Sequence, residues 1–399
     1  MQHYDLIIVG GGLVGTGLAV ALRDAGMRIA LIDARTPSHD DPRLFGLNIG
    51  SCNFLKNLGV WEDLSQHAFA IHEVHVSSKG HFGSVRLTND DIHLPSLGYV
   101  IPAKWLELTL NAKLQSQTHC TLYQPATVLS LDLQPNKSVL TVKQDQAEIS
   151  LSAPIVIGAD GTSSTIREQC HINADIHDYQ QTAIVTKLTL KRPHLHTAHE
   201  RFVTQGAIAL LPLNHEECAC IWSAATTHAD ELMSLSEANY VHALQTHFGT
   251  RAGKFIRITK RHQFPLRMVK AETAVKDGVY LLGNAAHTFH PIAAQGFNLA
   301  MYEVAVLVEA ILKKRELHEP FTSKDLLTVY EQTQKQQSVS LRISHGLSDG
   351  LFGSTFFQGI ALPIGLTGLN ILTPIKKHFL NRMLGRSGRV PRLLLSEIT

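Results

Sequence analysis

The stretch YDLIIVGGGLVG, residues 4–15, joins a short apolar run to a glycine-rich turn and the start of a helix. Gly10 permits a tight turn out of a buried strand, Gly12 lets backbone approach a pyrophosphate, and Gly15 lets the helix pack against the strand. The free N–H groups at the helix N-terminus and the helix dipole both favour negative charge there. This stretch therefore predicts a phosphate-binding turn for a dinucleotide.

A second apolar strand, residues 28–32, leads into Asp33, about twenty residues beyond the glycines. A carboxylate at this place suits a free ribose hydroxyl and repels a 2′-phosphate. The predicted dinucleotide is therefore FAD or NAD rather than NADP.

Length and composition bound the remaining possibilities. A chain of 399 residues exceeds a typical single core, so two domains are expected. The net charge of +2 gives no general argument for a nucleic-acid partner. Five scattered cysteines without a disulfide framework indicate reduced thiols in a cytoplasm. Cys218 and Cys220 are interpreted as alternate residues of one strand.

Two more strand-to-glycine junctions follow far along the chain, at residues 154–161 and 278–284. This interrupted spacing predicts one nucleotide-binding domain built from separated segments, with β-rich segments between them. The expected division is a nucleotide-binding domain at 1–71, 101–174 and 271–345, a β-rich substrate domain at 72–100 and 175–270, and a C-terminal helical segment at 346–399.

The third junction distinguishes FAD from NAD. Small residues flank Gln295 and Gly296, where backbone must approach a flat ligand, and a helix begins directly afterwards. The N-terminus of that helix would stabilise negative charge on a reduced flavin. FAD is therefore the predicted cofactor.

Three segments together resemble the fingerprints of class A flavoprotein aromatic hydroxylases: GGGLVG at 10–15, GADGTSSTIR at 158–167 and GNAAHTFHPIAAQGFNLA at 283–300. They occur in that family's order across nearly the whole chain. VHVSSKGH at 74–81 and ERF at 200–202 are similar to the ubiquinone-biosynthesis branch. The resemblance implies a Rossmann-like α/β fold with a β-sheet substrate domain and C-terminal helices.

The resemblance also implies roles for individual residues. The pyrophosphate would be held at Gly10, Gly12, Leu13, Val14 and Gly15; the adenosine ribose by Asp33 with Arg35 close by; the flavin phosphate or ribityl region by Arg43 and Asp160; and further cofactor contacts would come from Gly283, Asn284, Gly296, Phe297 and Asn298. The wall over the flavin ring would be built from residues 291–296, with Pro291, Ala294, Gln295 and Gly296 as candidates. No side chain is assigned as the catalytic acid or base.

Several positions depart from the family's pattern, among them Ala103 and Lys104, which replace a more usual Asn-Arg pair. Ala294 stands where a glycine is usual, which adds a methyl group close to the flavin. Glu303 stands where the helix usually carries aspartate.

The implied reaction is hydroxylation of a polyprenylated phenol, 2-polyprenyl-6-methoxyphenol by the closest resemblance, in ubiquinone biosynthesis. NADH or NADPH would visit transiently to reduce tightly bound FAD, and O₂ would form a flavin C4a-hydroperoxide that transfers one oxygen atom to the ring. Two alternatives stay open: an FAD-dependent isoprenoid reductase, and a non-catalytic FAD-binding subunit of a membrane-associated biosynthetic complex.

The C-terminal segment has an unusual composition. Residues 350–396 contain no acidic side chain, and an apolar stretch at 352–375 precedes Lys376, Lys377 and Arg382. This pattern favours docking on the inner-membrane surface or on other ubiquinone-biosynthesis proteins, and hence a cytoplasmic protein that is peripheral on the cytoplasmic face of the inner membrane. A helical hairpin packed on the core is the alternative.

Histidine spacing offers one further hypothesis, a metal site. His287 and His290 form one group, and His194, His196 and His199 form another. The first group lies inside a flavin fingerprint and the second in a polar loop, so no metal is expected.

Overall fold

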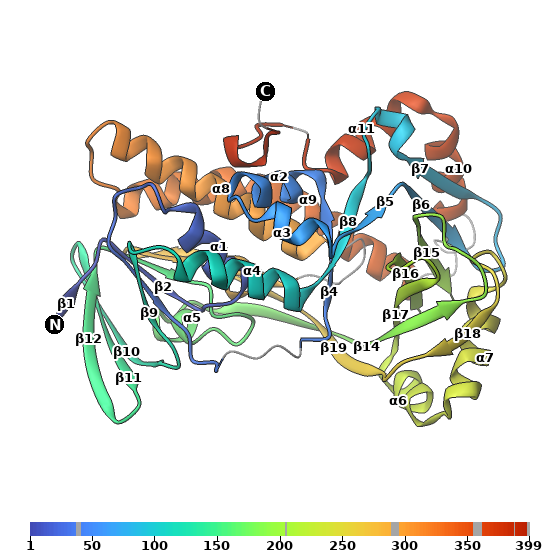
Figure 1. Cartoon of the computed structure of the whole chain (residues 1–399), viewed down its shortest axis with the longest axis horizontal. Coiled ribbons are helices and arrows are strands. Elements are labelled where there is room, and N and C mark those ends of the chain that lie inside the picture. Colours follow the sequence, from blue (N-terminus) through green and yellow to red (C-terminus); the bar gives the residue numbers. More distant parts are fainter. Residues whose placement is uncertain (37–40, 204–205, 289–294, 354–360, 387, 397–399) are drawn as a thin grey trace.

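A parallel sheet forms the centre of the nucleotide-binding half. The computed structural model describes residues 1–36, 41–203, 206–288, 295–353, 361–386 and 388–396 (Figure 1). Six of the described strands lie in the order β20 (Val275–Lys276), β21 (Val279–Leu281), β13 (Ile155–Gly158), β2 (Leu6–Val9), β3 (Ile29–Ile32) and β9 (Cys120–Tyr123). All except β20 run parallel. The unbroken apolar sequences of β2, β3 and β13 match strands buried on both faces.

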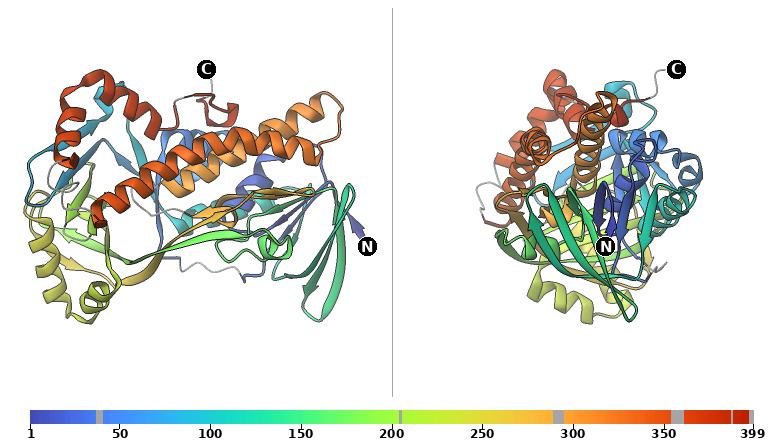
Figure 2. Two further views of the ribbon diagram at one scale, coloured as in Figure 1. Left: turned by 180° about the vertical axis from the view of Figure 1, so that it is seen from behind. Right: turned by 90° about the vertical axis from the view of Figure 1, so that its left-hand side faces the viewer.

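Helices cover this sheet. Helix α1 (Leu13–Ala21) contacts α4 (Ala103–Gln115) and α8 (Gln295–Glu316). Helix α9 (Ser323–Gly353) packs against α8, and these two long helices run along one side of the molecule (Figures 1 and 2). Two short helices, α2 (Ile49–Asn57) and α3 (Trp61–Ser65), lie beside them. The sequence predicts helices over about 296–312 and 323–347, and α8 and α9 each extend a few residues beyond the predicted C-terminal end.

A long antiparallel ribbon connects the two halves of the molecule. Strand β14 (Ala174–Leu190) pairs with β19 (His262–Ala271) from Ala174 opposite Ala271 to Val185 opposite His262. A bulge between Asp178 and Gln181 interrupts the register. Figure 1 shows β14 and β19 running from the nucleotide-binding half into the second sheet.

The second sheet contains nine described strands. Their order is β22 (His287–Thr288), β19, β14, β17 (Glu217–Ala225), β16 (Gly206–Pro212), β15 (Thr197–Val203), β6 (Glu73–Ser78) and β7 (Ser84–Thr88), with β18 (Phe255–Ile258) beside β14. One face packs against α6 (Thr226–Ser234) and α7 (Glu237–Phe248), where Trp222 contacts Tyr240. The opposite face carries apolar residues such as Leu87, Phe202 and Ala207 and borders a cavity.

The cysteine interpretation is confirmed on this sheet. Cys218 and Cys220 are alternate residues of β17, both are buried against α6 and α7, and both are free thiols. Burial raises the pKa of Cys218 to about 12, so this thiol is protonated and unreactive near neutral pH.

Two smaller sheets complete the β structure. Strands β4 (Leu44–Asn48), β8 (Gly98–Pro102) and β5 (Phe69–Ile71) connect the two halves. Strands β1 (Gln2–His3), β12 (Ala147–Ala153), β11 (Lys137–Gln144) and β10 (Thr127–Gln134) form a sheet at the far end of the nucleotide-binding half. The remaining short elements are α5 (Thr165–Gln169), η1 (Asn89–Ile92), η2 (Gly283–Ala285) and η5 (Arg392–Leu394).

The C-terminal segment folds back onto the second sheet. Helices α10 (Leu362–Ile371) and α11 (Thr373–Met383) bury Leu362, Leu366 and Leu380 in one apolar cluster with residues of β6, β7 and β15. Within the described residues, no helix is both long and apolar enough to cross a membrane. The prediction of a mixed α/β fold is confirmed. The domain boundaries stay a prediction, and the boundary expected between residues 345 and 346 falls inside α9.

One expectation about the C-terminal charges is wrong. Lys376 was grouped with the basic residues available to a partner or membrane, but its side chain is buried and its Nζ lies 2.7 Å from Asp91 Oδ2. Burial opposes ionisation of Asp91, yet hydrogen bonds from Lys376 and Thr88 hold its pKa below the usual range. The Lys376 ion pair fastens α11 to η1, whereas Lys377 stays exposed.

A buried carboxylate ties the third fingerprint to the long helices. Glu303, on α8, is 1% exposed. Its Oε1 accepts hydrogen bonds from His287 Nε2 and, at 2.7 Å, from Gln337 Nε2 of α9, while its Oε2 accepts from the Gly283 N–H at 3.2 Å. The glutamate that departs from the family's aspartate therefore joins four elements: α8, α9, η2 and β22.

We expect Glu303→Ala to destabilise the protein by about 3 kcal/mol, because it leaves several buried donors without their acceptor. The measurement is the free energy of unfolding from denaturant titration. Glu316→Ala, at the exposed end of the same helix, is the control and should change the free energy by less than about 0.5 kcal/mol. Equal stabilities of the two variants would contradict this role for Glu303.

Candidate functional site

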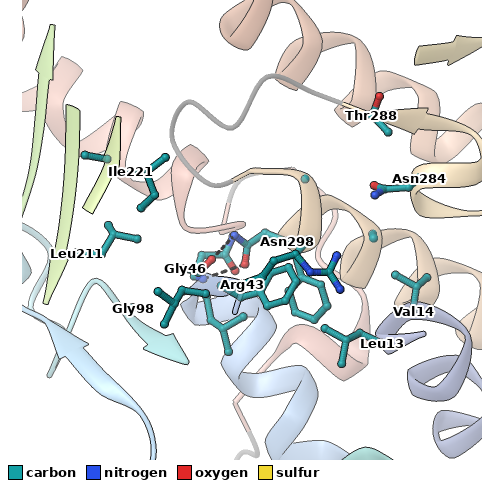
Figure 3. Close-up of a pocket in the computed structure, with 18 of the residues that line it drawn as sticks. Leu13, Val14, Arg43, Gly46, Gly98, Leu211, Ile221, Asn284, Thr288 and Asn298 are labelled. Atoms are coloured by element: carbon teal, nitrogen blue, oxygen red, sulfur yellow. Dashed lines mark hydrogen bonds between the residues drawn. The ribbon is translucent and has the colours of Figure 1, made fainter. Parts of the chain in front are cut away.

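One continuous cavity of about 1430 Å³ extends from the phosphate-binding turn to the second sheet. At one end it is lined by Gly12, Asp33, Arg43 and Asp160, and at the other by apolar residues of β6, β7, β15, β16, α10 and α11. In Figure 3, Asn284 and Thr288 lie on one side of this space, and Leu211 and Ile221 lie on the other. The nucleotide-binding half and the apolar chamber thus share one continuous space.

Contacts within the protein require glycine at three positions of the phosphate-binding turn. Gly10 has a φ of +108°, and a side chain there would collide with the Ala159 carbonyl. A side chain on Gly11 would lie 2.7 Å from Asp33 Oδ2, and one on Gly15 would collide with the Gly10 carbonyl. These contacts explain why the turn is tight and why α1 lies close to β2.

At Gly12 and Gly296, in contrast, a side chain would meet no close protein atom. A Cβ on Gly12 would have Arg35 Nη2, 3.6 Å away, as its nearest neighbour, and one on Gly296 would meet nothing within 4 Å. Both glycines line the cavity at the N-terminal ends of α1 and α8. Protein packing does not require a glycine at either place, so the open space fits a ligand that approaches the backbone closely.

Asp33 lies at the end of β3 and is 4% exposed. Arg35 donates to it from its backbone N–H, from Nε at 3.3 Å and from Nη2 at 3.2 Å, and Gln124 Nε2 donates at 3.2 Å. Glu107, which also lines the cavity, lies 3.8 Å from Arg35 Nη1. The sequence does not indicate Gln124 or Glu107 as neighbours of Asp33, because Gln124 directly follows β9 and Glu107 lies on α4.

Arg43 also lines the cavity (Figure 3). Its Nε donates to both carboxylate oxygens of Asp41 at 2.9 Å, and its guanidinium lies 5.7 Å from the Phe45 ring centre. Burial opposes ionisation of Asp41, but hydrogen bonds from Arg43 hold the Asp41 pKa below its usual range. The ion pair fixes the direction of the Arg43 side chain beside the cavity.

Asp160 follows β13 by two residues and caps the helix that comes next. Its Oδ1 accepts from Ser164 Oγ at 2.5 Å, and its Oδ2 accepts from the Ile166 N–H at 3.0 Å. Arg167 then donates to the Ala285 carbonyl at 2.8 Å and to the Thr162 carbonyl at 2.9 Å. Arg167 thus joins the second fingerprint to the third, a connection that sequence analysis did not predict.

Some residues of the third fingerprint face the cavity, and others have side chains that contact the protein. Gly283 has a φ of +58°, and Asn284 is exposed toward the cavity. Phe297 packs on Phe45 with ring centres 4.8 Å apart. The amide of Asn298 accepts from the Asn48 N–H and Ser51 Oγ and donates to the Gly46 carbonyl, so this side chain joins α8 to β4 and α2 (Figure 3).

Some predicted residues lie outside the described part of the chain. Pro291 and Ala294 are among them, and of Gln295 only the backbone at the start of α8 is described. The proposed wall over the flavin and the effect of Ala294 therefore stay predictions. The assignment of individual cofactor contacts also stays a prediction for the residues described above.

The histidine groups have other partners. His287 is bound to Glu303, and His194 Nε2 lies 2.6 Å from the Asn214 carbonyl. His290 is outside the described residues. Among the residues that are described, no group of three potential metal ligands comes together.

Comparisons with known proteins agree with this geometry. The chain is 29% identical over 399 residues to "Uncharacterized protein slr1300" of Synechocystis, covering 99% of this chain and 96% of that protein. It is 27% identical to "Ubiquinone hydroxylase UbiL" of Rhodospirillum rubrum, covering 96% of this chain and 89% of the relative. It is also 27% identical to the 3-demethoxyubiquinol 3-hydroxylase of Escherichia coli, covering 83% and 85%. The resemblance to the ubiquinone-biosynthesis branch of class A flavoprotein hydroxylases is confirmed.

Solved structures confirm the fold. The p-nitrophenol 4-monooxygenase PnpA of Pseudomonas putida matches with a TM-score of 0.79 at 16% identity, covering 97% of this chain and 100% of that one. The anhydrotetracycline hydroxylase OxyS of Streptomyces rimosus matches with a TM-score of 0.76 at 18% identity, covering 98% and 77%.

The family follows from the sequence match and the site together. The family model described as "FAD binding domain" matches residues 3–338, which include all three fingerprints. The open space at Gly12 and Gly296 supplies the close backbone approach that such a cofactor needs. The predicted cofactor is thereby confirmed, and this chain belongs to the FAD binding domain family.

Proposed function

We propose that this FAD-dependent monooxygenase hydroxylates a polyprenylated phenol, of the 2-polyprenyl-6-methoxyphenol type, in ubiquinone biosynthesis. A ring C–H becomes C–OH, the second oxygen atom of O₂ leaves as water, and NAD(P)H supplies the two electrons. The names of the relatives support the pathway, and the substrate class is our proposal.

The observation that carries this proposal is the apolar chamber joined to the nucleotide-binding end. Its lining includes Val74, Val76, Val85, Leu87, Ala207, Leu211, Ile221, Leu362, Leu366, Leu369 and Phe379. An isoprenoid chain is entirely apolar, so burying it against these side chains contributes about 25 cal/mol for each Å² removed from water. A small polar aromatic compound would leave most of this surface unused.

Our assignment of cofactor contacts follows the cavity lining. The backbone at Gly12, Leu13 and Val14 would hold the pyrophosphate, and Asp33 the adenosine ribose. Arg43, Asp160 and the start of α8 would adjoin the flavin half. Bound FAD supplies electron transfer from NAD(P)H and the activation of O₂. The protein positions the phenol ring, and its apolar lining excludes water from the reacting centre.

The outer faces of α10 and α11 support a membrane role for the C-terminal segment. Three apolar side chains are exposed around the turn between the helices: Ile371 (69%), Leu372 (48%) and Ile375 (54%). Ile364, about two helical turns before Ile371, is 57% exposed. The inner faces of the same helices line the apolar chamber. We propose that this apolar turn and the exposed Lys377 contact a lipid surface from which a polyprenylated substrate arrives.

Incorporation of labelled oxygen tests the reaction. We expect the purified protein with FAD, NADH or NADPH, ¹⁸O₂ and 2-farnesyl-6-methoxyphenol to yield a hydroxylated product carrying one ¹⁸O atom by mass spectrometry. A reduced isoprenoid chain without ¹⁸O would favour the reductase alternative. No product from any added phenol, despite full flavin content and an active control hydroxylase, would favour a non-catalytic FAD-binding subunit.

The pyrophosphate assignment is tested at Gly12. We expect Gly12→Ala to lower the flavin content of the purified protein and Gly12→Val to abolish it, because the added atoms occupy the cavity beside the turn. Absorbance of bound flavin per protein is the measurement. Gly17→Ala on the same helix is the control, since its Cβ would lie 3.8 Å from Phe54 in ordinary contact. Full flavin content in Gly12→Val would make our assignment wrong.

The lipid contact is tested by sedimentation with anionic vesicles. We expect the wild-type protein to sediment with phosphatidylglycerol vesicles at low salt and the Ile371→Ser/Leu372→Ser/Ile375→Ser variant to lose most of this binding. Lys377→Glu should weaken binding in a salt-dependent way, by roughly 1–2 kcal/mol. Ile176→Ser/Leu327→Ser, which changes exposed apolar residues elsewhere, is the control. A wild-type protein that stays in the supernatant would exclude direct lipid binding.

A further inference from the structure

One carboxylate interrupts the apolar face of the second sheet. Glu200, in the middle of β15, lies on the same side of that strand as Ala198 and Phe202, which are both buried in the cluster with α10 and α11. Its neighbours across the sheet are Val76 of β6 and Ala209 of β16, and all of these residues line the cavity. Among the described residues of β6, β7, β15, β16 and β17 that line the cavity from this face, Glu200 is the only ionisable one. Glu217 lies on the same face at the start of β17, but it is not part of the cavity lining, and its Oε2 accepts from Asn214 Nδ2 at 3.1 Å.

The Glu200 carboxyl has no protein partner within the described structure, in contrast to Asp33, Asp41, Asp160 and Glu303, which are all engaged. Its open side is the cavity. Burial raises the pKa of Glu200 to about 7, and no neighbouring charge contributes to this shift. An unpaired carboxyl in an apolar chamber costs free energy, and a group that a fold retains under such conditions is a candidate for ligand contact.

The other charged side chains near the cavity lie at its nucleotide-binding end or on the opposite face of β15. Those at the nucleotide-binding end are Asp33, Arg35, Arg43, Glu107 and Asp160. His199, the neighbour of Glu200 in sequence, points to the opposite face of β15, where its ring packs against Phe248 and His75. Arg201 also lies on that face, and its Nη1 donates to Ser77 Oγ. The described residues of α10 and α11 that line the chamber are not ionisable.

We propose that Glu200 binds the phenolic hydroxyl of the substrate and accepts its proton. This assignment rests on the proposed function, because it requires a phenol in the chamber. The phenolic O–H bond breaks, its electron pair stays on the phenol oxygen, and the proton forms an O–H bond on the Glu200 carboxylate. After hydroxylation of the ring, the proton returns from Glu200 to the phenolate oxygen, so the carboxylate is restored.

The chamber explains why such a group is useful. A phenolate ring is richer in electrons than a phenol and reacts more readily with an oxygen donor, but an isolated phenolate is costly in apolar surroundings. A carboxyl group whose pKa is close to the working pH can hold the proton beside the phenolate oxygen. The carboxyl group and the phenolate together then carry a single negative charge. Ala198, Phe202 and Val76 leave the hydroxyl few other polar partners.

Binding of a coloured phenol tests the contact without turnover. The probe is 2-farnesyl-4-nitrophenol, whose phenolate absorbs visible light and whose neutral form does not. We expect FAD-loaded wild-type protein at pH 7 to bind the probe largely as phenolate, and FAD-loaded Glu200→Gln to bind it more weakly and largely as neutral phenol. Glu148→Gln, which removes an exposed carboxylate on β12, is the control and should behave as wild type.

The pH profile tests the proton transfer. We expect wild-type kcat/KM to rise with pH and level off above about 7, because the carboxylate must be ionised to accept the proton. Glu200→Gln should lose this rise and lower kcat/KM by about 100-fold or more, within the usual range for a general base. Glu200→Asp, which keeps a carboxylate, should recover part of the activity and the pH dependence.

The outcomes separate this inference from the proposed function. If wild-type protein binds neither the probe nor other prenylated phenols, the proposed substrate class is wrong. If wild type and Glu200→Gln bind the probe with equal affinity and equal ionised fraction, and share one pH profile, the role of Glu200 is wrong while the hydroxylase function stands. Equal flavin content and thermal midpoints of the variants at pH 6 exclude misfolding as the cause of a difference.

Discussion

Parallel pairing of β2 with β3 and β13 is the constraint on which the site depends. Ile8 pairs with Leu31 on one side and with Ile157 on the other, which aligns the carboxyl ends of three strands that are far apart in the sequence. The chain leaves these ends at Gly10, Asp33 and Ala159, so the glycine-rich turn, Asp33 and the second fingerprint meet at one edge. The crowding at this edge in turn requires glycine at positions 10, 11 and 15, because any side chain there would collide with backbone or with Asp33.

The cavity joins two environments that one sheet could not supply. Its nucleotide-binding end has charged and backbone polar groups, which suit a pyrophosphate and ribose. Its other end is an apolar chamber between the second sheet and the C-terminal helices. The β14–β19 ribbon fixes these ends relative to each other, because its strands belong to the second sheet and β19 pairs with β22, which directly follows η2 in the third fingerprint. The cavity therefore offers a polar region and an apolar region within one continuous space.

The C-terminal helices have two faces with different surroundings. The inner residues, such as Leu366 and Leu380, complete the core and the chamber wall, and the Lys376–Asp91 ion pair fastens α11 in place. The exposed turn at Ile371, Leu372 and Ile375 points away from that core. The side chains of these helices that pack in the core are therefore different from those that we propose to contact a lipid surface.

The sequence by itself determined the features that depend on local geometry. Strand, glycine turn, helix and acid predicted the dinucleotide site around Gly10 and Asp33, and strand alternation placed Cys218 and Cys220 on one face, because each depends on periodicity or turn conformation. Only the tertiary structure decided features that depend on distant partners. Asn298 is hydrogen-bonded to β4, and Lys376 is paired with Asp91. Arg167 donates to the Ala285 carbonyl, and Glu200 faces the chamber. No local pattern shows these contacts, because burial and hydrogen-bond partners follow from how elements pack rather than from neighbouring residues.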